Sequence, residues 1–488
     1  MKKTIILASL LMAGMSMFSC NEDYLVTEPT ETVSNPPVAY RVNGLYNMMI
    51  NVGTGGTNLD HDDFGQKGYD IYMDLVQSDV VLDGTTYGWY SRVANYSDVI
   101  DFTRTTNYKP WRYYYRLIYG ANDIIDDLGG TDRTTFESDE DKFSFGQAKA
   151  MRAYAYFYLM QMYTPSYNPG EDAIPVYTSK YPVGVSNPKS KQSEVYDLII
   201  KDLKDAETLL ADFNRNNKAK IDKNVVAGLL AYTYAAIGEN GLAAAEAAKI
   251  VNSAYPVTAK NDVAYDTSVT SSYQGFNNLA NPSWVWGFDI TKENDMDLVS
   301  WWGQMDVFTY SYSWVGDTKS IDANLRAAIR PDDVRLKQFV LTPSYNNKYL
   351  ATGKFFAPNR TIGGQRIVET DYLFMRADEF HLLYAETLAK SGQEGTAKSV
   401  LKNFLSFRVE DTSFVDGLTG QALLDEIYLQ TRLELWGEGK SYLAMKRNNK
   451  PVVRGNTHLF YAGETIPAGD EKTYFKIPQA EILDNPHF

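Results

Sequence analysis

The sequence contains few of the residues that build metal and disulfide sites. It has one cysteine and four histidines in 488 residues. No disulfide can therefore form within the chain, and no zinc site of the Cys/His kind is expected. Cations are also scarce, since 47 Lys and Arg stand against 61 Asp and Glu, for a formal net charge of −14. Binding to nucleic acid needs clustered positive charge, so this balance argues against a nucleic-acid partner.

Long apolar runs are missing as well. Lys2 and Lys3 precede an apolar stretch over residues 4–14. This stretch is too short to cross a ~30 Å hydrocarbon layer as a helix, and it fits the core of a secretory signal. No later stretch approaches the roughly 18 apolar residues of a membrane-spanning helix.

The only cysteine, Cys20, lies just after this stretch and directly follows Ser19. A small residue before a lone cysteine resembles a bacterial lipobox, in which the signal peptidase cuts before the cysteine and the thiol is acylated. Met17 and Phe18 replace the usual Leu and Ala/Ser. We expect a lipoprotein signal peptide over residues 1–19 and lipidation at Cys20. The alternative is an ordinary secretory signal that ends near a cysteine.

Beyond Cys20 the chain divides into a tether and one domain. Residues 20–37 contain three prolines and read as a lipidated N-terminus with a flexible tether. The acidic run over residues 21–23 resembles the surface-export signal of Bacteroidetes lipoproteins. Residues 38–488 are expected to form a single α domain.

Helical periodicity is strong in that domain. Residues 193–212 carry a one-sided apolar stripe, residues 147–163 are apolar nearly all round, and residues 222–254 read as a helical hairpin capped by Asp222. The predicted fold is mostly α, a tetratricopeptide-like scaffold of helical pairs with long loops and a few short strands. The expected boundaries are a scaffold over about 109–255 and 371–447 (with a helix from residue 374), loop-rich segments over about 51–108 and 256–370, and one strand over 282–288.

Six stretches, in order along the chain, resemble the SusD/RagB family of surface nutrient-binding lipoproteins from Bacteroidetes. The block around Phe374–Glu386, with its Arg376, is the most specific, and the resemblance covers the whole chain. The stretches are residues 111–125, 149–159 with Ile174-Pro175, 226–231, 374–386, 432–439 with Lys446-Arg447, and 477–486. Residues 164–167 depart from the family, which often has Tyr-Gly-Asp there.

Aromatic residues are abundant, with 36 Tyr, 22 Phe and 8 Trp. Ring faces stack on sugar rings, and the family takes its ligand-contacting aromatics from an early loop and from the insertion before the last helical pairs. We therefore expect the ligand to be bound by Trp89, Tyr90, Asn95, Trp301, Trp302 and Trp314. The alternative is that these rings pack the loops onto the helices. Four other tryptophans are expected in the core: Trp111, Trp284, Trp286 and Trp436.

Other motifs are weaker. Asp60, Asp62 and Asp63 could supply oxygen ligands to Ca²⁺, but they lack the spacing and the closing Glu of an EF-hand. His381 has no partner at zinc spacing and is expected to be a core residue. No nucleophile elbow or HExxH motif is present. We therefore predict no catalytic residue, no metal and no cofactor.

The resemblance implies non-catalytic binding of a nutrient, most simply an oligosaccharide, by a lipoprotein on the surface of the outer membrane. It also implies delivery of that ligand to a SusC-like TonB-dependent transporter. Three alternatives stay open: a peptide-binding member of the same fold, a surface glycoside hydrolase, and a structural helical-repeat adaptor. The sequence does not indicate which glycan is bound.

Overall fold

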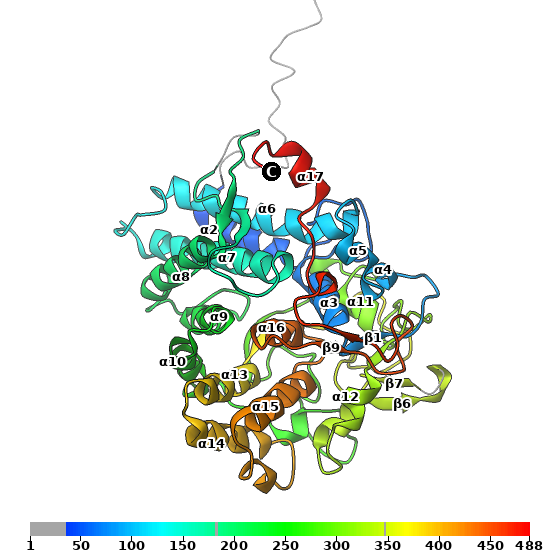
Figure 1. The fold of residues 1–488 in the computed structure, drawn as a ribbon. Coiled ribbons are helices and arrows are strands. Elements are labelled where there is room, and N and C mark those ends of the chain that lie inside the picture. Colours follow the sequence, from blue (N-terminus) through cyan, green and yellow to red (C-terminus); the bar gives the residue numbers. More distant parts are fainter. Residues whose placement is uncertain (1–35, 181–183, 346–347) are drawn as a thin grey trace, which may run out of the picture.

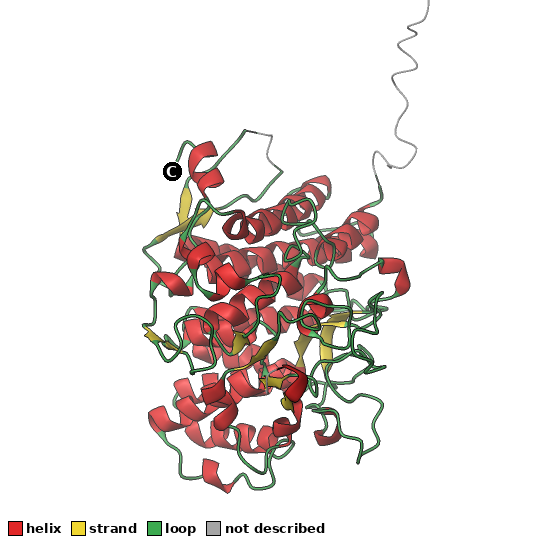
Figure 2. Cartoon of the chain, turned by 90° about the vertical axis from the view of Figure 1, so that its right-hand side faces the viewer, coloured by secondary structure: helices red, strands yellow, loops and turns green. Residues whose placement is uncertain are grey.

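The computed structural model describes residues 36–180, 184–345 and 348–488. Helices gather on one side of the molecule (Figure 1), and loops with short strands cover the other (Figure 2). The predicted mostly α-helical fold is confirmed. The predicted signal peptide, Cys20 and most of the predicted tether lie outside the described residues.

The scaffold is a succession of packed helices. From α6 to α10 each helix packs against the next, and α10 packs against α13 across the insertion that separates them in the sequence. No helix in the described ranges combines the length and the hydrophobicity needed to cross a bilayer. The main helices are α2 (Val38–Met48), α6 (Thr105–Asp127), α7 (Asp139–Tyr163), α8 (Gln192–Leu209), α9 (Lys223–Ala236), α10 (Asn240–Val251), α13 (Ala377–Lys390), α14 (Glu394–Leu405), α15 (Gly420–Glu434) and α16 (Lys440–Arg447).

Local sequence explains where several of these helices begin. The Asp222 carboxylate accepts hydrogen bonds from the backbone N–H groups of Asn224 and Val225, each at 3.0 Å, so it caps α9 as predicted. α7 begins earlier than predicted, at a cap formed by Ser138. α6 contains Pro110, which has no N–H and cannot donate to the carbonyl four residues before it.

The loop side contains a helix that was not predicted from the sequence. Every residue of α3 (Gln66–Gln77) is buried, although the segment 51–108 was expected to be loop-rich. Its polar residues pair with one another, since Gln66 Nε2 donates to Asp70 Oδ1 at 2.9 Å and Lys67 Nζ lies 2.9 Å from Asp70 Oδ2. The other short helices are α4 (Ser91–Ala94), α5 (Ser97–Ile100), α11 (Trp301–Met305), α12 (Ala323–Ala327) and α17 (Gln479–Asp484).

Among the described residues, the named strands pair antiparallel. They form one four-stranded sheet, in the order β1-β5-β7-β6, and three two-stranded sheets. The predicted strand over 282–288 is found as β4, which pairs with β8, so the helix expected from residue 374 begins only at Ala377. The strands are β1 (Val80–Leu82), β2 (Asp172–Pro175), β3 (Lys189–Lys191), β4 (Trp284–Phe288), β5 (Lys319–Ile321), β6 (Val340–Thr342), β7 (Lys348–Leu350), β8 (Tyr372–Arg376), β9 (Val452–Val453) and β10 (Thr465–Ile466).

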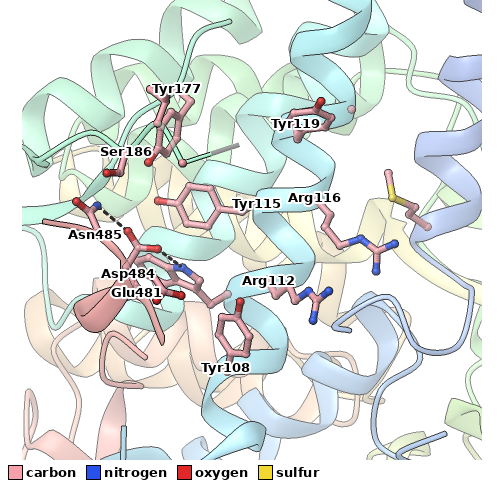
Figure 3. Close-up of a pocket in the computed structure, with 15 residues that line it drawn as sticks. Tyr108, Arg112, Tyr115, Arg116, Tyr119, Tyr177, Ser186, Glu481, Asp484 and Asn485 are labelled. Atoms are coloured by element: carbon pink, nitrogen blue, oxygen red, sulfur yellow. Dashed lines mark hydrogen bonds between the residues drawn. The ribbon is translucent and has the colours of Figure 1, made fainter. Parts of the chain in front are cut away.

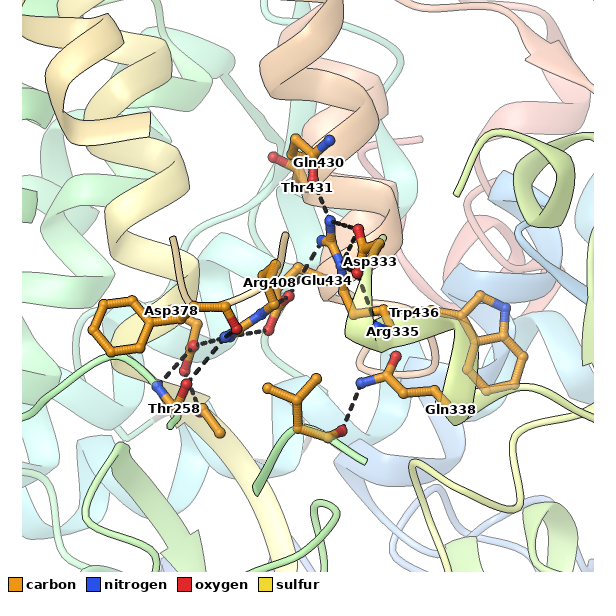
Figure 4. Close-up of polar contacts among 12 residues, drawn as sticks. Thr258, Asp333, Arg335, Gln338, Asp378, Arg408, Gln430, Thr431, Glu434 and Trp436 are labelled. Atoms are coloured by element: carbon orange, nitrogen blue, oxygen red, sulfur yellow. Dashed lines mark hydrogen bonds and ion pairs between the residues drawn. The ribbon is translucent and has the colours of Figure 1, made fainter. Parts of the chain in front are cut away.

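A buried ionic cluster joins β8, α13 and α15 to the loops that precede them. The Glu434 carboxylate lies 2.7 Å from Arg376, 2.8 Å from Arg408 and 3.3 Å from Arg335. Asp378 pairs with Arg408 at 2.6 Å. Figure 4 shows Arg408 and Arg335 on either side of Glu434. Burial alone would raise the pKa of Glu434, but Arg408 and Arg376 outweigh burial and hold that pKa well below its usual range.

Candidate functional site

The turn around Trp89 is fixed onto a second loop far along the chain. The Asp317 carboxylate accepts hydrogen bonds from the backbone N–H of Tyr87 at 2.9 Å and of Gly88 at 3.0 Å. The same two loops approach so closely at Gly84 that a Cβ there would lie 1.8 Å from the Gly316 carbonyl oxygen. This double attachment holds the Trp89 turn in one position.

Four rings form what we call the aromatic patch: His61, Tyr87, Trp89 and Tyr312. The His61 and Trp89 rings are stacked, with centroids 5.2 Å apart and an interplanar angle of 4°. Tyr312 contacts Trp89 at 6.1 Å and Tyr87 at 5.3 Å between centroids, and its hydroxyl hydrogen-bonds His61 Nδ1. Tyr87 is 65% exposed and Trp89 is half-buried, so the patch reaches the surface.

Buried hydrogen bonds connect the loops that carry the aromatic patch. Lys319 Nζ donates to the backbone carbonyls of Gln304 at 2.9 Å and Asp317 at 3.1 Å. Gln304 in turn donates from Nε2 to the His61 carbonyl at 2.7 Å. Burial lowers the pKa of Lys319 to about 8. One buried ammonium group thus positions both loops that carry the rings.

Beside the patch lies a polar cavity of about 300 Å³, whose lining includes Trp89, Tyr90, Asp98, Thr106 and Lys109. Two buried acceptors, Asp98 Oδ1 and the Tyr90 hydroxyl, have no hydrogen-bond partner among the described residues. Burial raises the pKa of Asp98. Both atoms are buried, and Asp98 Oδ1 lies 3.9 Å from Arg104 Nε. The polar lining that is open to solvent includes the Asp60 carboxylate, whose side chain is 41% exposed.

The three aspartates considered above as Ca²⁺ ligands form ion pairs and hydrogen bonds within the protein. Asp60 and Asp62 pair with Lys109 at 2.8 and 2.6 Å. Asp63 accepts hydrogen bonds from the backbone N–H groups of Gly55 and Thr57, at 2.7 and 3.1 Å. In the described parts of the chain, no three His, Cys, Asp or Glu side chains come together as metal ligands would.

Of the six predicted ligand residues, only Trp89 lies in the aromatic patch. Tyr90 is a buried wall of the polar cavity. The Asn95 side chain accepts a hydrogen bond from the Ser97 N–H at 2.9 Å and so closes a turn. Trp314 is half-buried against Tyr310, with centroids 5.4 Å apart, away from the polar cavity.

Trp301 and Trp302, which were expected to bind the ligand from a loop-rich segment, instead begin the short helix α11 and have buried rings. They are 2% and 1% exposed, and both rings pack against Phe355. The reason is local, because Ser300 caps the short helix α11 by accepting a hydrogen bond from the Gly303 N–H at 3.0 Å. This helix directs the indoles into the core. The four tryptophans predicted to be core, Trp111, Trp284, Trp286 and Trp436, are buried as expected.

Sequence reasoning missed three members of the aromatic patch. Tyr87 and Tyr312 lie in the loop-rich segments expected over about 51–108 and 256–370, but the prediction named the nearby Trp89 and Trp314 instead. No pattern in the sequence singles out His61, since its contact with Tyr312 joins positions 251 residues apart.

A larger cavity of about 580 Å³, here called the α6 cleft, lies between α6, α17 and the segment around Tyr177 (Figure 3). Tyrosines line it along α6. Trp111 Nε1, at the edge of the cleft, lies 3.3 Å from Glu481 Oε2 and so connects α6 to α17. The sequence analysis did not predict this cavity.

Two family models and one related protein match parts of this chain. A family model described as starch-binding and associating with the outer membrane matches residues 62–235, and the SusD family model matches residues 341–487. A SusD-like protein P25 from Formosa agariphila is 27% identical over 155 residues, a match that spans 30% of this chain and only 28% of that relative's length.

Solved structures extend the likeness to the whole fold. A SusD-like carbohydrate-binding protein from Bacteroides vulgatus has a TM-score of 0.75 at 21% identity, covering 92% of this chain and 96% of its own. A SusD superfamily protein from Bacteroides fragilis has a TM-score of 0.71 at 22% identity, covering 95% and 99%. At these identities the likeness concerns the fold alone.

The two family models fall on the segments where the sequence stretches were recognised. One contains α6 to α8 and most of α9, and the other contains α13 to α17. The stretch between them, which includes Gln304, Tyr312 and Lys319, matches neither model. With its scaffold matched on both sides of this insertion and its helical fold shared with solved members, the chain belongs to the SusD/RagB family.

Proposed function

We propose that the protein binds carbohydrate at the cell surface without chemically changing it, at the aromatic patch and the polar cavity. One observation carries the proposal: the exposed Tyr87 ring and the half-buried Trp89 ring line the polar cavity together with charged side chains. A pyranose ring has an apolar C–H face that can stack on Trp89 and hydroxyl edges that can donate to Asp60, whose side chain is 41% exposed at the cavity. The aromatic patch and polar cavity together match both parts of such a ligand.

The relatives support the same proposal. One matching family model is described by starch binding and by association with the outer membrane. We infer that Cys20 carries the lipid anchor and that a SusC-like TonB-dependent transporter is the partner that receives the ligand. Several acyl chains on one N-terminus would hold the protein on the membrane, since each buried CH₂ contributes about 0.8 kcal/mol.

The binding site is tested with glycan and peptide arrays probed by the chain from residue 21, which contains every described residue. We expect binding to glycans, and Trp89→Ala should weaken it at least about tenfold, or 1.4 kcal/mol. Tyr40→Ala is the matched control, because Tyr40 is 68% exposed on α2 and lines neither cavity. Binding to peptides alone, or equal affinity in all three proteins, would contradict the proposal.

The absence of catalysis and the partner need separate tests. A glycan that binds should be recovered intact after long incubation with the protein. Release of new reducing ends that stops on substitution of a single Asp or Glu would establish a glycoside hydrolase instead. Co-expression of the full-length protein with a SusC-like transporter from the same genome should yield a complex that co-purifies, and separate elution would count against the partnership.

A further inference from the structure

The α6 cleft presents a row of rings along one helix. Tyr108, Tyr115 and Tyr119 follow one another at spacings of seven and four residues, which places them on one face of α6. Figure 3 shows this row along α6, with Tyr115 turned toward α17. Tyr119 is 40% exposed, so the row reaches the surface. A row of this kind gives a ligand several flat, rigid contacts at little cost in side-chain entropy.

The opposite wall supplies polar groups. Asp484 and Asn485, at the end of α17, line the α6 cleft together with Glu481. Asn485 Nδ2 donates to Glu481 Oε1 at 2.8 Å and to the Asn187 carbonyl at 2.9 Å, so this wall is fixed in place. Asp484 is exposed and can accept hydrogen bonds from ligand hydroxyls. Rings on one wall and carboxylates on the other form the same pairing as the aromatic patch and polar cavity.

The two cavities share α6 as a common wall. Thr106 and Lys109 line the polar cavity, whereas Tyr108 lines the α6 cleft. Successive positions of a helix turn by about 100°, so the neighbours Tyr108 and Lys109 face the two cavities from adjacent sides of α6. Between them lies the turn over residues 53–57, where Gly55 approaches the Lys109 side chain.

This dividing turn is fixed from α6 itself. Arg116 donates to the Thr54 carbonyl at 2.8 Å, and Arg112 donates to the Gly56 carbonyl at 3.3 Å. A Cβ at Gly56 would lie 2.2 Å from the Arg112 guanidinium, so the turn and the arginine are closely fitted. A ligand that uses both cavities must therefore pass over a firm ridge on α6.

We infer that the α6 cleft is a second carbohydrate site, so that one glycan chain lies across α6 with separate segments in the cleft and in the polar cavity. This inference rests on the proposed function, since it assigns the same class of ligand to both cavities. The volume of about 580 Å³ falls within the range of roughly 300–1,000 Å³ for small-molecule sites. Two linked contacts raise affinity through effective concentration, which requires a chain long enough to span the ridge.

The test uses native gels that contain one immobilised polysaccharide each: starch, arabinoxylan, mixed-linkage β-glucan, mannan or pectin. Five proteins are compared: the chain from residue 21, its variants Tyr119→Ala, Trp89→Ala and the double variant, and Tyr40→Ala as control. We expect at least one gel to retard the unsubstituted chain, each single variant to be retarded less, and the double variant to migrate freely.

The outcomes separate the two proposals. Normal retardation of Tyr119→Ala, with loss in Trp89→Ala, overturns the second site and leaves the proposed function standing. If retardation is lost in Tyr119→Ala alone, the glycan is bound at the α6 cleft and not at the polar cavity, which contradicts binding across two cavities. If no gel retards the unsubstituted chain, both proposals fail. Circular dichroism of each variant distinguishes lost binding from lost folding.

Ligand length gives a second measurement. Oligosaccharides prepared by partial acid hydrolysis of the retarding polysaccharide are sorted by size and titrated calorimetrically. For the unsubstituted chain, affinity should rise at least tenfold above a threshold length, and this rise should vanish in Tyr119→Ala. A rise of the same size in Tyr119→Ala would show that both contacts lie outside the α6 cleft.

Discussion

The buried cluster around Glu434 and the polar cavity of the loop side differ in how completely their charged side chains are hydrogen-bonded. In the scaffold, no side-chain nitrogen or oxygen of Arg335, Arg376, Arg408 or Glu434 lacks a partner among the described residues. On the loop side, one oxygen of Asp98, which lines the polar cavity, makes no hydrogen bond and lies 3.9 Å from Arg104 Nε. A buried polar group without a hydrogen bond costs about 1–3 kcal/mol. The comparison teaches that the cluster around Glu434 is built for stability, whereas the lining of the polar cavity is less completely hydrogen-bonded.

The largest expected effect comes from a substitution in the buried cluster around Glu434. Glu434→Gln keeps the shape of the side chain but removes the charge shared by three arginines, so it should cost about 3–5 kcal/mol of unfolding free energy. Chemical denaturation measures this loss. The control on the same helix, Asp425→Asn, affects only exposed contacts, with Lys450 and Gln421, and should cost less than about 1 kcal/mol. Equal losses would mean that the buried cluster contributes no more than a surface pair.

The next prediction compares two tryptophans of the loop side. Trp302→Ala removes a fully buried indole and should cost about 3–5 kcal/mol. Trp89→Ala removes a half-buried ring and should cost markedly less, while it weakens ligand binding. Thermal denaturation and ligand titration of both variants check this division. A stable Trp302→Ala protein that has lost ligand binding would show that Trp302 belongs to the binding site.

A smaller effect depends on pH and concerns another buried pair of the scaffold. Burial alone would raise the pKa of Glu386, but Arg447 at 2.7 Å and Lys390 at 2.8 Å lower it to about 2 from the usual 4.5. A depressed folded-state pKa adds stability above pH 4.5 that is lost as the pH falls toward 2. At about 1.4 kcal/mol per pKa unit, this amounts to about 3 kcal/mol.

The matched variant for this prediction is Glu386→Gln. Its unfolding free energy should lie below that of the unsubstituted chain at pH 7, and the two should converge as the pH approaches 2. Denaturant titrations at a series of pH values measure the difference. A difference that stays constant over the whole range would show that the ionised carboxylate is not the source of the stability.

The smallest expected effect lies beneath the aromatic patch. Lys319→Met removes the ammonium group that holds the carbonyls of Gln304 and Asp317, and it should cost about 1–3 kcal/mol of stability. Because these two residues position His61 and the Trp89 turn, ligand affinity should fall about threefold to tenfold. Calorimetric titration at pH 7 measures the change. Unaltered affinity would show that the patch keeps its geometry without this support.

Patterns among residues near in sequence were enough to predict much of the helical scaffold, but not the candidate binding site. The apolar stripe of α8 and the cap at Asp222 depend on residues near in sequence, and both predictions are confirmed. α3 was missed although its apolar residues follow a helical period, because it is short and lies in a segment whose composition is rich in Gly, Asn and Asp. Trp302 was misplaced because the exposure of a ring depends on distant packing, here against Phe355.

Pro110 has a consequence for the mouth of the polar cavity. A helix normally satisfies each carbonyl with the N–H four residues later, and for Thr106 that residue is Pro110, which has none. The Thr106 oxygen therefore lacks its helical donor on a residue that lines the polar cavity. A single imino acid in α6 thus leaves the main-chain carbonyl of a cavity-lining residue without its usual hydrogen bond inside the helix.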